Sequence, residues 1–176
     1  AIPNQDDREV KLLRAELLIR DERPAEAELL LQAACECSNE EQDHFIYDSI
    51  GIFMDYMLWD YAESWCMRLK HISPKYKGLP EIEAEIKMCT GDYDSAIDIL
   101  NGILDINSYN SQAWNMLAES YFSKGTFEEA IEACQFALAI NEDDFKAIST
   151  LADCYYHTSS FSKAHEYYEK ALMMRQ

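Results

Sequence analysis

Apolar side chains recur at spacings of three and four residues over residues 113–122, which predicts an amphipathic helix. Gly125 interrupts the pattern, as a residue that can adopt a left-handed conformation after a helix. A second apolar stripe over residues 127–138 predicts a second helix, and Thr126 with Glu129 has the spacing of a capping box at its start. The predicted unit is therefore a helix, a tight turn and a second helix.

The same pattern returns along the chain at a period of about 34 residues. Such a period predicts an array of helical repeats, because one pair of helices cannot bury its apolar stripes without a neighbour. We predict a single domain over residues 1–176 with five repeats, at about 8–41, 43–76, 77–110, 111–144 and 145–176. The two clearest columns are Ala62, Ala96, Ala130 and Ala164, and Trp59, Tyr93, Phe127 and Phe161.

Three repeats depart from the pattern at single residues. Met57 occupies the turn position of Gly125, so we expect a longer or differently shaped turn in the second repeat. Ser159 occupies the same position in the fifth repeat, at a cost of up to about 1 kcal/mol if the turn requires a left-handed residue. Pro80 can stand only in the first turn of a helix, which predicts a short helix over about 79–90.

This arrangement resembles the tetratricopeptide repeat (TPR) family. The resemblance covers nearly the whole chain and implies an all-α solenoid of ten helices in helix-turn-helix repeats, wound as a right-handed superhelix. The sequence departs from the family pattern at Cys134, where an aromatic residue is usual, and at Glu142, where proline is usual. With Ser111 counted as repeat position 1, the matching residues are Trp114, Leu117, Ala118, Tyr121, Ala130 and Ala137.

The resemblance also implies a binding surface, because the first helices of TPR repeats line a concave groove for peptides. Repeat positions 2, 5, 9, 12 and 13 lie on that face, and position 9 is a carboxylate in four of the five repeats. A row of carboxylates beside methionine and aromatic residues would suit a basic or amphipathic peptide segment. The alternative is that one acidic residue per repeat is only a solvated helix face. The candidate groove residues are Glu16, Tyr47, Met54, Glu81, Glu85, Met88, Asn115, Glu119, Phe122, Ser149, Asp153 and Tyr156.

The charge of the chain narrows the choice of partner. Thirty-three acidic and fifteen basic residues give a net charge of -18, which disfavours nucleic acid and anionic membrane surfaces and favours basic partners. Solubility alone would also explain this charge. No apolar run has the length of a membrane span. Six cysteines at predicted helix positions, without zinc-type pairs, suit reduced thiols, so we expect a cytoplasmic protein, although a chain that begins at Ala1 leaves a removed targeting segment open.

The sequence favours no catalytic, metal or cofactor chemistry. Asp153, Cys154 and His157 lie within one helical turn, but no second pair of ligands at zinc-site spacing accompanies them. No nucleophile–base pair and no glycine-rich phosphate loop is evident. The carboxylate clamp of the family is incomplete, since Lys146 is basic but Met116 stands where asparagine is usual. We therefore expect no enzyme, no metal and no cofactor, and binding of an acidic C-terminus is disfavoured.

Two functional hypotheses remain. The first is a protein–protein interaction scaffold that holds a basic or amphipathic segment in the acidic groove. The second is a structural, self-assembling or regulatory domain of a larger protein, which would use its terminal helix or its aromatic second repeat. Apolar residues of the last helix would lack a neighbour, so we expect further chain or another molecule there, such as a second copy in a homodimer through the C-terminal helix. These residues are Tyr168, Ala171, Leu172 and Met173. The alternative is a simple exposed end with a modest apolar surface.

Overall fold

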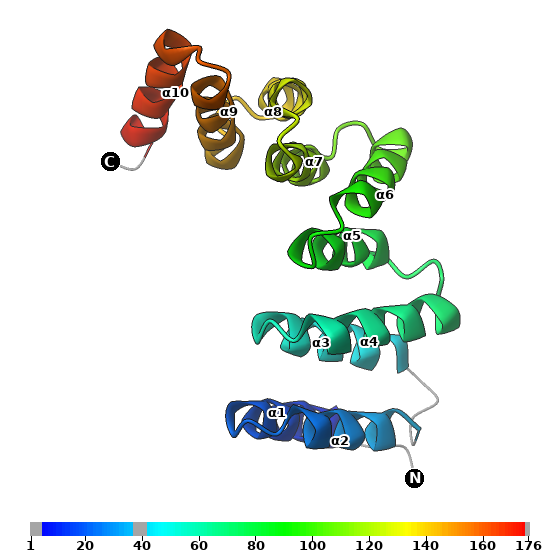
Figure 1. The fold of residues 1–176 in the computed structure, drawn as a ribbon. Helices are drawn as coiled ribbons and strands as arrows, with labels where there is room; N and C mark the ends of the chain where they lie inside the picture. Colours follow the sequence, from blue (N-terminus) through cyan, green and yellow to red (C-terminus); the bar gives the residue numbers. More distant parts are fainter. Residues whose placement is uncertain (1–4, 37–41, 175–176) are drawn as a thin grey trace. The chain divides into compact units, whose positions relative to one another are not determined.

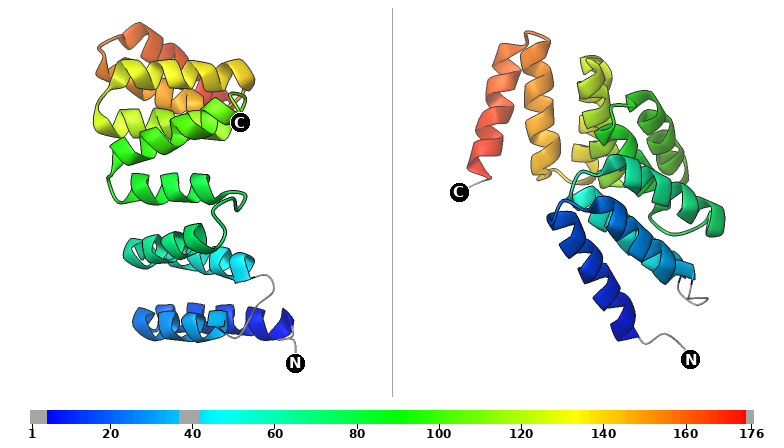
Figure 2. Two further views of the ribbon diagram at one scale, coloured as in Figure 1. Left: turned by 90° about the vertical axis from the view of Figure 1, so that its right-hand side faces the viewer. Right: turned by 60° about the horizontal axis from the view of Figure 1, so that its bottom comes forward.

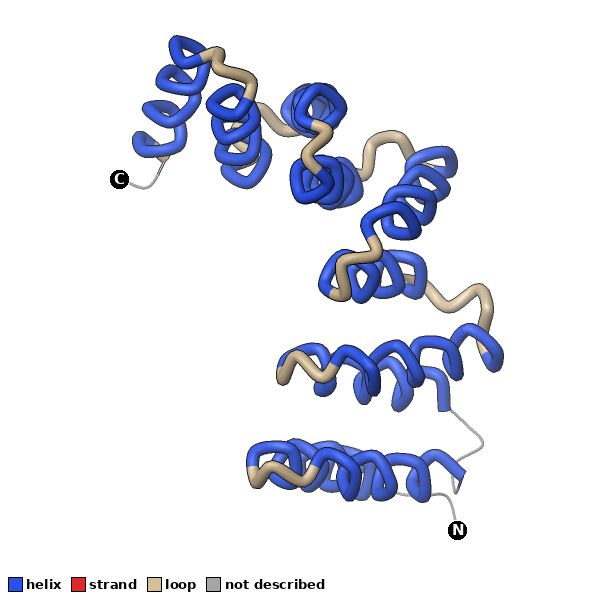
Figure 3. The backbone as a smooth tube through the Cα atoms, viewed as in Figure 1, coloured by secondary structure: helices blue, strands red, loops and turns tan. Residues whose placement is uncertain are grey.

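The computed structural model describes residues 5–36 and 42–174. These residues form ten helices joined by turns and loops, without a strand (Figures 1 and 3). The all-α class and the helix-turn-helix repeats predicted from the sequence are thereby confirmed. The helices are α1 (Gln5–Arg20), α2 (Pro24–Glu36), α3 (Gln42–Asp55), α4 (Trp59–Ile72), α5 (Leu79–Cys89), α6 (Tyr93–Ile106), α7 (Ser111–Lys124), α8 (Phe127–Ile140), α9 (Phe145–His157) and α10 (Phe161–Met173).

The chain divides into two compact units, Ala1–Ile82 and Glu83–Gln176, and each is described by itself. The first unit contains α1 to α4 and the first turn of α5, and the second contains the rest of α5 and α6 to α10. Within the second unit α9 and α10 lie side by side as one hairpin of helices (Figures 1 and 2). The single domain and the superhelical curvature predicted for the whole chain stay predictions.

One turn geometry joins the two helices of every repeat. The residue in the left-handed region stands two positions before the second helix, and its φ lies between 56° and 84° in all five turns. In the fourth repeat the amide of Gly125 donates to the carbonyl of Phe122 at 2.9 Å, and the next amide donates to Tyr121 at 3.0 Å. The other four turns repeat this pair of bonds. The five left-handed residues are Glu22, Met57, Gly91, Gly125 and Ser159.

The turn expectations are therefore corrected in one case and confirmed in another. The turn at Met57 is neither longer nor differently shaped, since Met57 itself adopts φ 56° and keeps both hydrogen bonds. Packing of the helix pair imposes the conformation although the side chain disfavours it. Ser159 is left-handed, with φ 59°, as the repeat pattern requires.

The predicted capping box is wrong. Helix α8 has no side-chain cap, because the hydroxyl of Thr126 donates backward to the carbonyl of Tyr121 at 3.2 Å. Side-chain caps instead begin α6, α7 and α9, where Asp92, Asn110 and Asp144 accept from backbone amides. The short helix predicted around Pro80 is confirmed as α5, with Pro80 in its first turn.

The alanines of the column identified in the sequence belong to the core of the repeats. Ala62, Ala96 and Ala130 are fully buried, and Ala164 nearly so. The second repeat is packed by aromatic side chains: Phe53 and Trp65, for example, are buried, with ring centroids 6.1 Å apart. These two rings belong to the core of the second repeat and are not part of its surface.

Candidate functional site

The predicted groove residues fall in both units of the chain. Glu16, Tyr47, Met54 and Glu81 belong to the first unit, and the other eight belong to the second. All twelve lie on the first helices of their repeats, as the resemblance implies. A groove continuous along all five repeats stays a prediction.

In the first unit two of the predicted residues make local contacts. The carboxylate of Glu16 accepts a hydrogen bond from the hydroxyl of Tyr56 at 3.1 Å, which ties α1 to the turn that follows α3. The ring of Tyr47 lies 5.0 Å from that of Tyr76, and a Cβ on Gly78 would come within 3.3 Å of the Tyr47 hydroxyl. Gly78 has φ 89°, so both its conformation and this close approach favour glycine.

In the second unit an acidic residue of α5 and one of α7 both lie near the thiol of Cys89. Burial raises the pKa of the Cys89 thiol, and the nearby charges of Glu85 and Glu119 raise it further. Helices α7 and α9 are in contact, which places Asp153 on the next first helix of the same unit. We call Glu85, Glu119 and Asp153 the acidic row.

Two members of the acidic row already have partners. Glu119 forms a partly exposed ion pair with Lys146, with 3.0 Å between carboxylate oxygen and Nζ. Asp153 accepts a hydrogen bond from the hydroxyl of Tyr168, which raises the pKa of Tyr168 to about 12. Lys146 therefore offsets part of the negative charge of the row, whereas the hydroxyl of Tyr168 occupies an acceptor of Asp153 without changing its charge. Lys146 stands at repeat position 2 on the same face, so its pairing could have been anticipated, whereas the contact with Tyr168 depends on the second helix.

The side chain of Asn115 links the fourth repeat to the fifth. Its side chain is buried and donates to Asp144 at 2.7 Å, and the hydroxyl of Ser111 donates to the same carboxylate at 3.0 Å. Asp144 also caps α9 by accepting from the amides of Lys146 and Ala147. Burial acts to raise the pKa of Asp144, but these hydrogen bonds outweigh it and hold the pKa below its usual value. Asn115 thus fastens α7 to the start of α9.

The apolar members of the predicted site lead into an aromatic cluster at the turn end of the helices. Phe122 lies edge-on to Phe127 and to His157, with centroids 5.6 and 5.5 Å away, and His157 stacks on Phe127 at 4.7 Å. Tyr156 is exposed and lies 5.7 Å from Phe161. The sequence pattern selected Phe122 and Tyr156 but missed the other three rings, which belong to the second helices or face the turn.

Met88 and Ser149 complete the predicted set. Met88 is partly buried against the core of the second unit, beside α6 and α7. The hydroxyl of Ser149 donates to the carbonyl of Lys146 within its own helix, at 3.0 Å.

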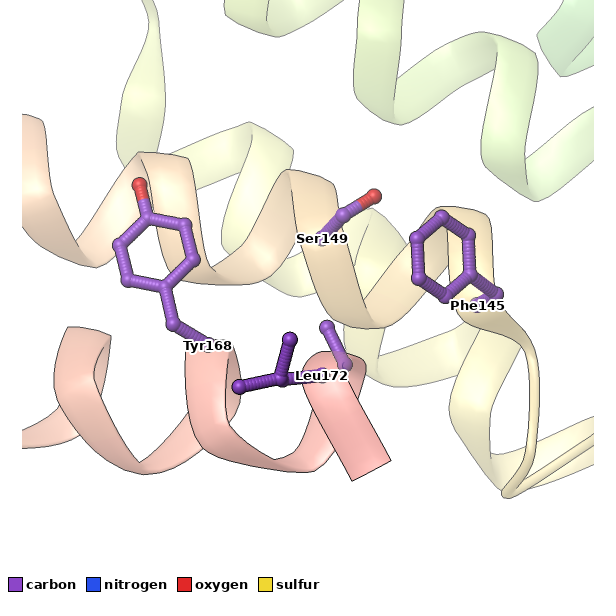
Figure 4. Close-up of a pocket in the computed structure, with 5 residues that line it drawn as sticks. Phe145, Ser149, Tyr168 and Leu172 are labelled. Carbon is purple, nitrogen blue, oxygen red and sulfur yellow. The ribbon is translucent and has the colours of Figure 1, made fainter. Parts of the chain in front are cut away.

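A shallow apolar pocket of about 360 Å³ opens between α9 and α10. Figure 4 shows Phe145 and Ser149 on α9 facing Tyr168 and Leu172 on α10. Ser149 is the one predicted groove residue among those lining it. We call this surface the tail face and define it by Phe145, Ser149, Tyr168, Ala171 and Leu172.

The described residues contain no group of three or more His, Cys, Asp or Glu side chains arranged to hold a metal ion. Five cysteines are free thiols, of which only Cys89 is exposed, and Cys37 lies outside the described residues. Within the described ranges, every helix is too short or too polar to cross a membrane. The expectations on catalysis and on a cytoplasmic location stay predictions.

Comparison with known proteins supports the fold assignment. Residues 109–176 match a family model of the tetratricopeptide repeat. A search of the curated proteins gave no match.

Similar solved structures include MamA residues 41-end from Desulfovibrio magneticus RS-1, with a TM-score of 0.76 and 15% identity over 96% of this chain and 94% of that one. A second similar structure, a crystal structure of MamA, has a TM-score of 0.73 and 17% identity over 92% of this chain and 94% of the other. At these identities the structures establish the fold. Residues 109–176 thus belong to the tetratricopeptide repeat family by the family match, and the rest of the described residues have the same helix-turn-helix fold.

Proposed function

We propose that this chain is a protein-binding scaffold whose first-helix face in the second unit holds a basic, amphipathic peptide segment. The first-helix face is defined by Glu85, Met88, Glu119, Phe122, Asp153 and Tyr156. The observation that carries the proposal is that three carboxylates lie on α5, α7 and α9 of one unit, with α7 and α9 in contact, because nearby carboxylates add their fields.

The apolar residues of this face supply anchors beside the charges. Tyr156 is 56% exposed and Phe122 is partly exposed, and both rings lie against His157 in the aromatic cluster. Aromatic side chains contribute much of the energy at protein interfaces, because they bury a large area for few rotatable bonds. A peptide with a basic residue every third or fourth position and leucines between could contact both kinds of residue.

The partners of the acidic row set limits on the bound state. An incoming lysine or arginine would have to share Glu119 with Lys146, whereas Glu85 is exposed. Arginine suits this arrangement better than lysine, since its planar guanidinium can bond a carboxylate with two donors. We expect Glu85 to contribute most among the three acids.

A titration with a synthetic amphipathic peptide of lysine and leucine tests the proposal. Glu85→Gln, Glu119→Gln and Asp153→Asn together should weaken binding about tenfold, because each charge pair contributes about 0.5 kcal/mol. The matched control replaces three exposed acids of the second helices, with Asp105→Asn, Glu128→Gln and Glu132→Gln, and removes the same charge. Equal weakening by both triples would mean that only net charge attracts the peptide, and the proposed face would be rejected.

A further inference from the structure

The tail face repeats a surface that is covered elsewhere in the same unit. Counted in repeat positions, its five residues correspond to Ser111, Asn115, Cys134, Ala137 and Leu138 of the fourth repeat. There, Asn115, Cys134 and Ala137 are buried. On the tail face the corresponding Tyr168 is partly exposed and Leu172, which corresponds to Leu138, is 63% exposed.

Helix α9 is what covers the surface of the fourth repeat. Its cap Asp144 accepts from Ser111 and Asn115, and Cys154 is close enough to Cys134 to help raise the pKa of that thiol, after burial itself. At repeat positions 3, 6 and 10, α9 holds Ala147, Thr150 and Cys154. Ala147 and Cys154 are buried, and Thr150 is partly buried.

Helix α1 has apolar residues at the same repeat positions as the residues of α9 just named. With Arg8 as position 1, positions 3, 6 and 10 of α1 are Val10, Leu13 and Leu17, which are 51%, 60% and 57% exposed. In α7 the same positions are buried, as Ala113, Met116 and Ser120, and the first two belong to a core cluster that includes residues of α6 in the preceding repeat. We call Val10, Leu13 and Leu17 the head stripe.

We propose that a second copy of this chain docks its head stripe on the tail face, so that α1 of one copy continues the repeat stack of the next in the way α9 continues the fourth repeat. This contact extends an interface that already exists within the chain, between α9 and the pair α7 and α8. Since it joins two different surfaces, it is heterologous and produces a ring or an open filament.

The charges of the two end helices are compatible with this contact although the chain is strongly acidic. Helix α1 holds four acidic and four basic residues, and α10 holds two of each. The net charge of -18 therefore resides outside the two helices. Repulsion between whole copies acts at longer range and is screened by salt, so association should strengthen as salt rises. Binding of the basic peptide should weaken under the same change, which separates this contact from the proposed function.

Sedimentation velocity of the chain from about 5 to about 500 µM, at low and high salt, tests the contact. We expect species larger than a dimer at the highest concentration. Leu13→Glu and Leu172→Glu should each weaken association about tenfold or more, because each places a charge in the contact. Met67→Glu on α4, where Met67 is 61% exposed, is the matched control and should leave association unchanged. Circular dichroism should show all three variants folded.

An equimolar mixture of Leu13→Glu and Leu172→Glu copies gives the sharpest outcome. Each variant keeps the surface that the other has lost, so the mixture should form a dimer and nothing larger. A monomeric wild type at the highest concentration and high salt would overturn the proposal. So would assembly that survives Leu13→Glu but not Leu172→Glu, since that result indicates a symmetric contact between two tail faces. Neither result would affect peptide binding to the first-helix face.

Discussion

The fourth and fifth repeats share the same helix-turn-helix structure, but they differ in the turn residue and in what packs on the far side of the helix pair. The fourth has a glycine at its turn, a buried polar link from Ser111 and Asn115 to Asp144, and α9 packed on its far side. The fifth has Ser159 at its turn and the tail face, with Leu172 exposed. A repeat of this kind is therefore stabilised largely by the first helix of its successor.

Asp144→Ala should produce the largest difference, because it removes what fastens the two repeats. The variant loses the cap of α9 and leaves buried Asn115 without its acceptor, at a combined cost of about 2–3 kcal/mol. Chemical denaturation followed by circular dichroism measures this loss. Asp143→Ala changes the exposed neighbouring carboxylate and should stay within about 0.5 kcal/mol of the parent. Equal losses would show that Asp144 has no special role.

Truncation of one equivalent leucine in each repeat compares the covered and open surfaces directly. Leu138→Ala should cost about 1–2 kcal/mol, because Leu138 is partly buried against the core of the second unit. Leu172→Ala should cost less than about 0.5 kcal/mol in dilute protein, because its side chain is mostly exposed. Thermal denaturation at low micromolar concentration is the measurement, and a larger cost at Leu172 would contradict the comparison.

The turns offer a reciprocal exchange. Ser159→Gly should stabilise the chain by up to about 1 kcal/mol, and Gly125→Ser should destabilise it by a similar amount, since both positions are left-handed. A Cβ at Gly125 would meet no atom within 4 Å, so the change reports backbone conformation and not crowding. Urea denaturation of both variants checks the exchange, and a stabilising Gly125→Ser would refute it.

Acid should weaken the link at Asp144 by a small amount. The pKa of this carboxyl is lowered in the folded chain, so its stabilisation is present above the unfolded-state pKa and is lost as pH falls through the folded-state value. Asp144→Asn should retain the cap but not the charge. The difference in unfolding free energy between parent and variant should therefore be largest near neutral pH and shrink below about pH 4. A difference independent of pH would contradict the assignment.

Much of the fold could be predicted because it depends on local periodicity. The alanine column and the three- and four-residue spacing gave five helix pairs, and Gly125 marked the left-handed turn. Met57 gave the wrong expectation, since glycine is only one way to meet a conformation that helix packing enforces. Thr126 failed as a cap because its hydroxyl had a competing backbone acceptor at Tyr121.

The candidate site could be predicted less fully, because pairing between repeats leaves a weak trace in one sequence. The register placed Glu119 and Asp153 on first helices, but their partners Lys146 and Tyr168 became clear only from distances. Asn115 was selected for a groove and is buried in a contact between repeats instead. A periodic pattern identifies a helix face, whereas the contacts that each side chain makes depend on the neighbouring helix.

The most direct test of the proposed function locates the bound peptide. Amide chemical-shift changes should be recorded by nuclear magnetic resonance while the lysine–leucine peptide is added to the labelled chain. The proposal predicts that the largest changes fall on α5, α7 and α9, around Met88, Phe122 and Tyr156. Changes confined to the tail face or to the second helices α6 and α8 would contradict it.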